Sequence, residues 1–315
     1  MLAHTVEHND CVGNGAGEPD EGTTSHSTPV DGFRLAYDDA GSGEPVVLLH
    51  GWPGHRGDYA RVVPLLTGHA RLIVPDLRGF GESDRHAVEP AVGYSAAAQV
   101  RSILGLLDEL RIERAVFAGY DVGSGVIQAV IRHAPHRVRA AAVTPPVPGA
   151  GSRLLRPETQ AEFWYQSLHR LPLADSLLDA HPENVRIYLR HIWSHWSGQD
   201  FPLSAEDFDR LAGLYSRPGA FTASIGWYRA QRPMGVVAEH APATAGRTTV
   251  PFEVLWPGRD ALFPLEWSDH LDDWFTNAHL VVEPDSGHFV PLQAPQAFAD
   301  AVMRALAAAT RVKPV

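Results

Sequence analysis

One segment near the middle of the chain limits the possible folds more than any other. Residues 115–118 form a short apolar run typical of a buried strand, and residues 126–131 form an apolar run that favours a helix. The turn between them, residues 119–123, reads Gly-Tyr-Asp-Val-Gly. Glycines on both sides allow a strained central residue and keep side chains away from the neighbouring strand and helix. The segment predicts a strand, a sharp turn that presents Asp121, and a helix.

Asp121 stands where such turns usually carry serine. A serine serves acyl transfer, whereas an ionised carboxylate can attack an electrophilic carbon and form an ester. Asp260 and His288 also follow strand-like runs, so the order along the chain is nucleophile, acid, histidine. His288 would activate water for a second step, because a carboxylate needs no deprotonation. Asp260 would then hold the imidazole in the required tautomer.

A second loop offers a backbone donor. Residues 50–54, His-Gly-Trp-Pro-Gly, follow the apolar run 46–49. Loops at the carboxyl ends of central strands carry ligand-binding backbone in open α/β sheets. Gly51 allows close approach, and the N–H of Trp52 is free to point at a developing negative charge. We therefore expect Trp52 to help stabilise an oxyanion.

The order of strand-like and helix-like segments predicts a mostly parallel α/β sheet flanked by helices. The apolar runs of strand length lie at 46–49, 72–75, 115–118, 138–143, 252–256 and 280–282. Between 147 and 245 this pattern stops, and prolines separate short helices rich in aromatic residues. We predict a helical lid over 147–245, a core formed by 29–146 and 246–315, and a disordered polar tail over 1–28.

Composition excludes several classes of protein. The formal net charge of -11 argues against a nucleic-acid partner. Cys11 is the only cysteine, so no intramolecular disulfide can form. We see neither a membrane-spanning run nor a secretory signal, and we expect a cytoplasmic protein without a membrane partner. His191 and His195 lie four residues apart, but no third ligand of suitable spacing accompanies them, so no metal site is expected.

Several motifs together resemble the α/β-hydrolase-fold epoxide hydrolases. They are the loop 50–53, the Gly-rich loop 76–83, the Asp-centred turn, Asp260 and the Ser-Gly-His run 286–288, and the resemblance extends from about residue 30 to 310. It implies the α/β-hydrolase fold, with a helical lid inserted before the last strands. The same core motifs occur in haloalkane and haloacetate dehalogenases, so they specify a superfamily rather than one reaction.

The resemblance also implies roles for two lid tyrosines. Epoxide hydrolases of this family use two such phenols as hydrogen-bond donors to the epoxide oxygen. The stretch 225–229, Ile-Gly-Trp-Tyr-Arg, is similar to the later site and points to Tyr228, and the stretch 163–166, Phe-Trp-Tyr-Gln, points to Tyr165. The backbone N–H groups of Trp52 and Val122 would form the oxyanion hole. The expected reaction opens a small apolar or aromatic epoxide to a vicinal diol without cofactor or metal.

Departures from the related enzymes weigh against dehalogenation. Many relatives have Trp directly after the nucleophile, where this chain has Val122. Haloalkane dehalogenases commonly have Asn where Trp52 stands, and haloacetate dehalogenases have an Arg after the nucleophile that residues 122–130 lack. The alternatives are a haloalkane or haloacetate dehalogenase with the same three residues, and a hydrolase-fold binding protein without turnover. The sequence also leaves open whether the chain forms a homodimer.

Overall fold

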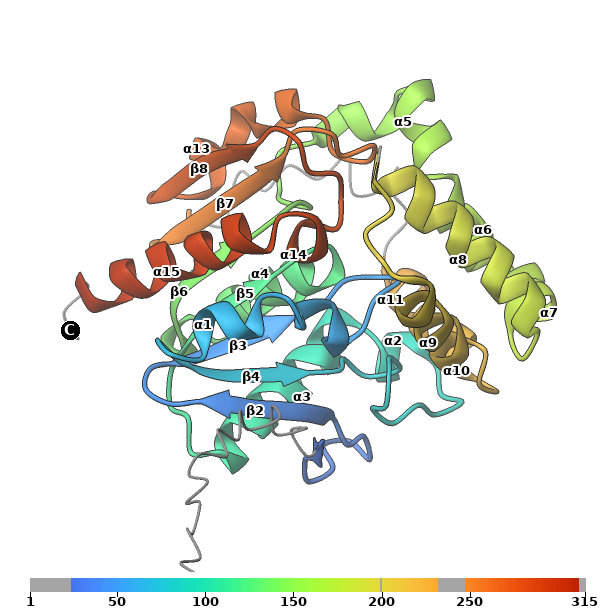
Figure 1. Cartoon of the computed structure of the whole chain (residues 1–315), viewed down its shortest axis with the longest axis horizontal. Helices are drawn as coiled ribbons and strands as arrows, with labels where there is room; N and C mark the ends of the chain where they lie inside the picture. Colours follow the sequence, from blue (N-terminus) through green and yellow to red (C-terminus); the bar gives the residue numbers. More distant parts are fainter. Residues whose placement is uncertain (1–23, 199, 232–246, 312–315) are drawn as a thin grey trace, which may run out of the picture.

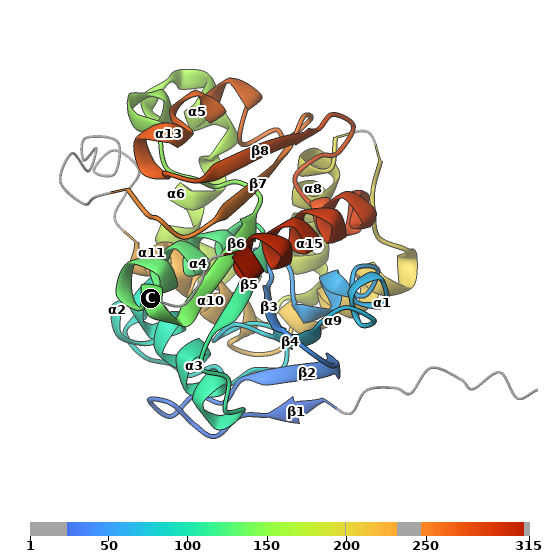
Figure 2. The same cartoon turned by 90° about the vertical axis from the view of Figure 1, so that its left-hand side faces the viewer.

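The structure is a computed structural model that describes residues 24–198, 200–231 and 247–311. These residues form an eight-stranded sheet in the order β1-β2-β4-β3-β5-β6-β7-β8. The strands from β4 to β8 in this order run parallel, and β1 and β2 form an antiparallel edge (Figure 2). The strands are β1 (Ser25–His26), β2 (Ala36–Gly41), β3 (Pro45–Leu49), β4 (Arg71–Pro75), β5 (Ala115–Gly119), β6 (Val138–Val143), β7 (Phe252–Pro257) and β8 (Ala278–Glu283). The predicted mostly parallel sheet is confirmed.

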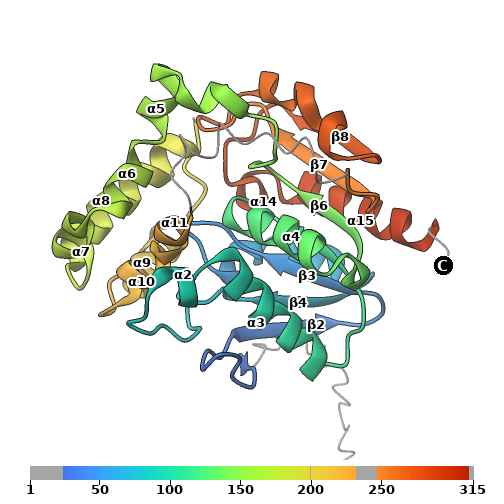
Figure 3. The same cartoon turned by 180° about the vertical axis from the view of Figure 1, so that it is seen from behind.

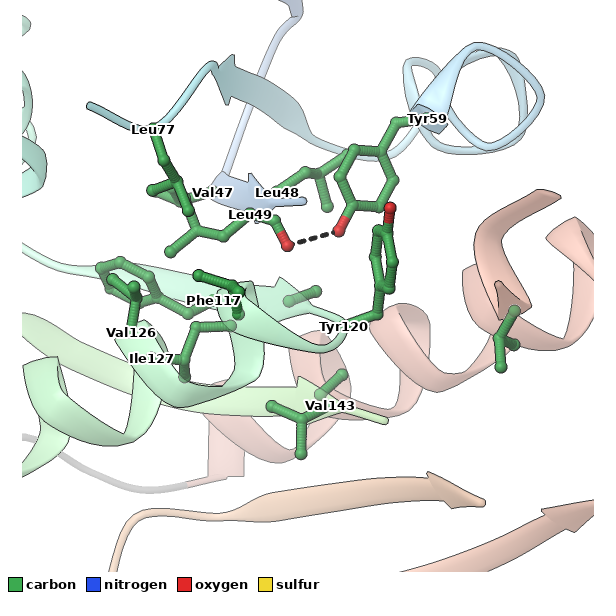
Figure 4. Packing of buried hydrophobic residues seen from close by; sticks show 14 of the residues in the cluster. Val47, Leu48, Leu49, Tyr59, Leu77, Phe117, Tyr120, Val126, Ile127 and Val143 are labelled. Atoms are coloured by element: carbon green, nitrogen blue, oxygen red, sulfur yellow. Dashed lines mark hydrogen bonds between the residues drawn. The ribbon is translucent and has the colours of Figure 1, made fainter. Parts of the chain in front are cut away.

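The two central strands are covered on both faces, which is why their sequences are continuously apolar. β3 and β5 pair in register from Val46 opposite Val116 to Leu49 opposite Gly119. The side chains of residues 46–49 and 115–118 are fully buried or nearly so. Figure 4 shows this packing, with the Tyr59 hydroxyl donating a 2.7 Å hydrogen bond to the Leu49 carbonyl at the end of β3. The loops that follow β3 and β5 therefore start from rigid positions.

Helices cover both faces of the sheet. Figure 1 shows α1 (Val63–Leu66) and α15 (Pro295–Arg311) on one face, and Figure 3 shows α3 (Ala96–Glu109) and α4 (Val122–His133) on the other. The hydroxyl of Ser95 caps α3 by accepting a 3.3 Å hydrogen bond from the N–H of Ala98. The remaining core helices are short: η1 (Arg56–Tyr59), α2 (Pro90–Gly93), η2 (Pro135–Arg137), η4 (Leu265–His270), α13 (Leu271–Trp274) and α14 (Val290–Gln293).

The described part of the chain between β6 and β7 forms helices and the loops that join them, with no named strand. They lie together on the side towards which β3 and β4 point (Figure 1), and we call α5 to α11 the cap. Proline at the first turn begins α5, α7 and α8, where its missing N–H costs no hydrogen bond. The helices are η3 (Gly151–Leu155), α5 (Pro157–Glu162), α6 (Trp164–Arg170), α7 (Pro172–Leu178), α8 (Pro182–Trp196), α9 (Ala205–Tyr215), α10 (Ala220–Ser224) and α11 (Gly226–Ala230).

The end of the predicted polar tail differs from the described structure. Ser25 and His26 pair with β2, so the sheet includes residues that we assigned to the polar tail. Backbone pairing to an open sheet edge requires no apolar side chains, which is why composition did not reveal it. Residues 1–23 of the predicted tail and residues 232–246 of the predicted lid lie outside the described residues.

Candidate active site

The predicted strand, turn and helix around Asp121 form as expected. β5 ends at Gly119, α4 begins at Val122, and Asp121 has φ 48° and ψ -118°. Such a backbone conformation costs a non-glycine residue about 1–3 kcal/mol. The flanking glycines are required by close packing against β3. A Cβ at Gly119 would lie 2.6 Å from the Leu49 carbonyl oxygen, and a Cβ at Gly123 would overlap the same atom.

Two groups from other loops contact the Asp121 carboxylate. The backbone N–H of Trp52 donates a 2.7 Å hydrogen bond to Oδ1. Nε2 of His288 lies 3.5 Å from Oδ2. Asp121 is also the N-terminal neighbour of α4, where the helix dipole favours negative charge. The carboxylate is therefore held in one orientation.

His288 joins Asp121 to the second carboxylate, Asp260. Nδ1 of His288 lies 2.9 Å from Oδ2 of Asp260, and the N–H of Leu262 donates a 2.8 Å hydrogen bond to Oδ1. An ionised Asp260 can only accept, so the proton of the neutral imidazole belongs on Nδ1. All three predicted residues are at most 8% exposed. The structure thus brings together Asp121, Asp260 and His288.

The two carboxylates control the charge of His288. Burial alone would lower the pKa of the imidazole. The charges and hydrogen bonds of Asp260 and Asp121, of which the Asp260 charge is the strongest, outweigh burial and raise the pKa of His288 to about 10. The imidazolium form is therefore favoured at neutral pH while both aspartates are ionised. Neutralising Asp121 by ester formation would remove part of this stabilisation. The protonation of His288 is thus coupled to the state of Asp121.

Both predicted tyrosines lie next to Asp121. Tyr165 on α6 and Tyr228 on α11 have ring centroids 5.6 Å apart, with ring planes at 88°. Burial, followed by neighbouring negative groups that include Asp121, holds the pKa of each phenol well above its usual value. Tyr165 Oη accepts a long hydrogen bond from Gln166 (3.4 Å), whereas the buried Tyr228 hydroxyl has no partner among the described residues. Both phenols therefore keep their protons, and Tyr228 is free to donate.

A cavity of about 170 Å³ connects these groups. Asp121 and the two tyrosines lie in its wall, and Asp121 is its one acidic or basic lining residue within the described chain. Gln166 adds a further polar group, and the other lining residues are Val122, Gly125, Pro146, Leu154, Phe163, Trp227 and Phe263. The cavity thus combines one polar corner at the carboxylate with apolar walls.

Sequence reasoning missed an aromatic group that surrounds the tyrosines. The indole of Trp52 lies parallel to the Tyr165 ring at 5.8 Å and edge-on to the Tyr228 ring at 5.7 Å. His169 contacts the same rings, its Nε2 lies 2.9 Å from the Tyr188 hydroxyl, and burial holds the pKa of His169 well below its usual value. No sequence signal identifies these contacts, because they depend on how the cap helices pack on the core.

A buried carboxyl next to the turn was also missed. Asp58 accepts hydrogen bonds from the Tyr120 hydroxyl and from the backbone N–H of His55, the latter at 3.0 Å. Burial is the main cause that raises the pKa of Asp58 to about 7. Tyr120 directly precedes Asp121, so Asp58 supports the turn from behind. An aspartate in a short 3-10 helix has no sequence pattern that would reveal its burial or its contact with Tyr120.

The described residues contain no group of three or more His, Cys, Asp or Glu that could hold a metal ion. The His191 and His195 rings stack with centroids 6.0 Å apart, and Nε2 of His195 lies 2.6 Å from a carboxylate oxygen of Glu162. Among the helices in the described part of the chain, none has the length and apolar character needed to cross a membrane.

Comparison with known proteins defines the class of protein to which this chain belongs. The chain belongs to the alpha/beta hydrolase fold family, whose model matches residues 44–295. A soluble epoxide hydrolase from a Corynebacterium species is 25% identical and covers 89% of this chain and 96% of its own length. Haloalkane dehalogenase 2 of Mycobacterium bovis is 26% identical, over 86% of this chain and 90% of that protein.

A solved structure agrees with the fold. The epoxide hydrolase CorEH without ligand superposes with a TM-score of 0.79 at 24% identity, and the match covers 91% of this chain and 99% of the other. At this identity the similarity establishes the fold alone. Relatives with different reactions share it, so the reaction has to be argued from the site.

Proposed function

We propose that this hydrolase opens an epoxide with water to give a vicinal diol. The cap acts as the lid of the site, and the substrate is a small apolar or aromatic epoxide. In the first step an oxygen of Asp121 attacks one epoxide carbon, the carbon–oxygen bond of the ring breaks, and an ester forms. Tyr165 and Tyr228 hold the departing oxygen, and one phenol gives it a proton. Sharing the developing charge between two donors lowers the barrier.

The second step hydrolyses the ester. Once Asp121 is esterified, its negative charge no longer stabilises the imidazolium of His288. His288 then gives its proton to the tyrosinate that ring opening leaves. Neutral His288, held by Asp260, then takes a proton from water as the water oxygen attacks the ester carbonyl. The N–H groups of Trp52 and Val122 stabilise the oxyanion. Collapse of this intermediate breaks the ester bond, and His288 gives its proton to the departing diol oxygen. The proton left on the Asp121 carboxyl then passes to His288, which restores the starting state.

One observation carries the proposal. Asp121 and the hydroxyl-bearing rings of Tyr165 and Tyr228 line the same cavity, and the buried Tyr228 hydroxyl has no hydrogen-bond partner within the described chain. A buried, unpaired hydroxyl costs free energy unless a ligand satisfies it. An epoxide oxygen accepts such a hydrogen bond while its carbon faces the carboxylate. Two phenols in this position would stabilise a departing halide less than they stabilise a departing epoxide oxygen.

The test is to trap the ester. A His288→Gln variant incubated with styrene oxide should accumulate a covalent adduct on Asp121 with the mass of the intact epoxide, detected by mass spectrometry of the protein and its peptides. Asp121→Asn is the matched control and should remain unmodified. Adducts formed only from alkyl halides, with halide released, would assign a dehalogenase instead. Neither adduct nor diol across a broad panel of epoxides and halides would favour a binding protein.

A further inference from the structure

The loop that carries the Trp52 N–H is held by the cap as well as by the core. We call residues 50–54 the oxyanion loop. On the core side, the Trp52 N–H bonds to Asp121, and Nδ1 of His50 lies 2.8 Å from the Gly51 carbonyl oxygen. The carbonyl groups of Pro53 and Gly54 bond to the cap. Both residues are buried, so each carbonyl needs a donor that bulk water does not supply.

Two cap helices supply these donors. Nε1–H of Trp193, on α8, donates a 3.1 Å hydrogen bond to the Pro53 carbonyl. The hydroxyl of Tyr215, the last residue of α9, donates a 2.9 Å hydrogen bond to the Gly54 carbonyl. Both donor side chains are at most 2% exposed, so neither bond competes with bulk solvent. The cap therefore holds the oxyanion loop through hydrogen bonds to the consecutive carbonyls of Pro53 and Gly54.

Helix α8 also touches the loop that carries His288. The Trp193 indole stacks on Phe289, with centroids 3.6 Å apart and planes at 11°. The backbone N–H of His288 donates a 2.9 Å hydrogen bond to the Trp196 carbonyl at the end of α8. Trp193 thus contacts the oxyanion loop on one side and the histidine loop on the other. Helix α8 sets the spacing between these two loops.

We propose that Trp193 and Tyr215 are positioning residues that hold the oxyanion loop so that the Trp52 N–H stays aimed at Asp121. This inference rests on the proposed function, in which that N–H stabilises the oxyanion formed from the Asp121 ester. Oxyanion donors act only within narrow limits of distance and direction, and removal of one costs about 10²–10³ in rate. Displacing the Trp52 N–H, rather than removing it, should reduce the rate by a smaller factor.

The test compares two substitutions in adjacent residues. Tyr215→Phe removes the hydroxyl that holds the loop. Ser216→Ala removes a hydroxyl that bonds within α9 only, to the Ala212 carbonyl at 2.6 Å. Rapid-quench mass spectrometry with styrene oxide follows formation and hydrolysis of the Asp121 ester. Tyr215→Phe should slow ester hydrolysis by about tenfold and ester formation less, because the oxyanion exists only in the second step. Ser216→Ala should change neither rate.

A second readout does not depend on turnover. Hydrogen–deuterium exchange of the peptide that contains residues 50–54 should be faster in Tyr215→Phe and unchanged in Ser216→Ala. Trp193→Phe keeps an aromatic ring against Phe289, removes the Nε1–H donor, and should repeat both effects. Equal exchange and equal rates in Tyr215→Phe, Trp193→Phe and Ser216→Ala would overturn the proposal. So would an equal slowing of both steps that follows a lowered melting temperature.

These outcomes are separate from the proposed function. If the wild-type protein forms no ester with any epoxide, the epoxide assignment fails, while the exchange experiment still decides whether the two cap residues hold the loop. If the ester forms and the variants behave as the control does, the assignment stands and the positioning role is wrong.

Discussion

Asp121 combines a strained backbone with a carboxylate held by the Trp52 N–H at 2.7 Å. The strain is sustained because both neighbours are glycines packed against the end of β3. The two carboxylate oxygens have different partners, since Oδ1 faces the backbone donor and Oδ2 faces His288. In the proposed reaction, the backbone donor would therefore orient the attacking carboxylate, and His288 would serve the proton transfers that follow.

Tyr228 should show opposite effects on stability and activity. Tyr228→Phe removes a buried hydroxyl that has no partner in the described chain, so the free energy of unfolding should stay the same or rise by up to about 1 kcal/mol. The rate of ester formation should fall by about 10²-fold, since one of two acid groups is lost. Denaturant unfolding and single-turnover kinetics measure the two effects.

Tyr94→Phe is the contrasting variant for this prediction. Its hydroxyl donates to the His86 carbonyl at 2.6 Å and accepts from the His86 N–H at 2.8 Å, and Tyr94 does not line the active-site cavity. This variant should lose stability and keep its activity. Full ester formation by Tyr228→Phe would contradict the role of Tyr228 as a donor.

His288 should make folding stability depend on pH. Its pKa is raised from 6.5 to about 10 in the folded protein, so the folded state holds a proton that the unfolded state releases earlier. The resulting stability is complete below about pH 6.5 and is lost as pH rises towards 10. Chemical unfolding at pH 6, 8 and 10 should show a larger loss for the wild type than for His288→Gln. Parallel pH dependence of the two proteins would contradict this coupling.

At the scale of elements, the contact between α4 and α11 shapes the cavity. Trp227, on α11, lines the cavity and stands over Gly125 of α4, where an added Cβ would lie 3.1 Å from the indole. The cavity measures about 170 Å³, and an apolar cavity of about 150 Å³ is known to hold benzene. A single aromatic ring therefore matches the space beside Asp121.

Shortening Trp227 should change the size of substrate that is accepted. For Trp227→Ala we expect kcat/KM for a naphthyl epoxide to rise about tenfold relative to that for styrene oxide, a magnitude typical of altered apolar pockets. Gly125→Ala pushes against the indole and should shift the ratio the other way. Steady-state kinetics on both epoxides provide the measurement. An unchanged ratio in both variants would show that this contact does not set specificity.

The packing of the turn on β3 should be intolerant of even one methyl group. In Gly123→Ala the new Cβ would overlap the backbone carbonyl of Leu49, so β3 or α4 has to shift, at a cost of about 3 kcal/mol or more. Gly213→Ala in α9 is the control, because nothing lies within 4 Å of its added Cβ, and it should stabilise the protein by about 0.5–1 kcal/mol. Urea unfolding of both variants checks the difference.

At the scale of the whole molecule, the sheet and the helical segment between β6 and β7 could be predicted, whereas the packing of the cap on the core could not. Buried parallel strands are continuous apolar runs, so β3 to β7 are evident in the sequence, and residues just after them meet at one edge of the sheet. That is why Asp121, Asp260 and His288 could be grouped in advance. The contacts of the Trp52 indole, His169 and Asp58 depend on packing between distant segments, which one sequence does not encode as a local pattern. Tyr165 and Tyr228 were found through resemblance to a family rather than through periodicity.

The aromatic lining of the site has a practical consequence for measurement. Three of the eight tryptophans surround the reacting groups: Trp52 lies beside Tyr165, Trp227 lines the cavity, and the Trp196 ring centroid is 5.2 Å from that of His288. Indole emission responds to nearby charge and polarity. Neutralising Asp121 and filling the cavity would change both at once, so the protein carries its own optical probe. Its ultraviolet fluorescence should report each turnover in real time, without a label or a coloured substrate.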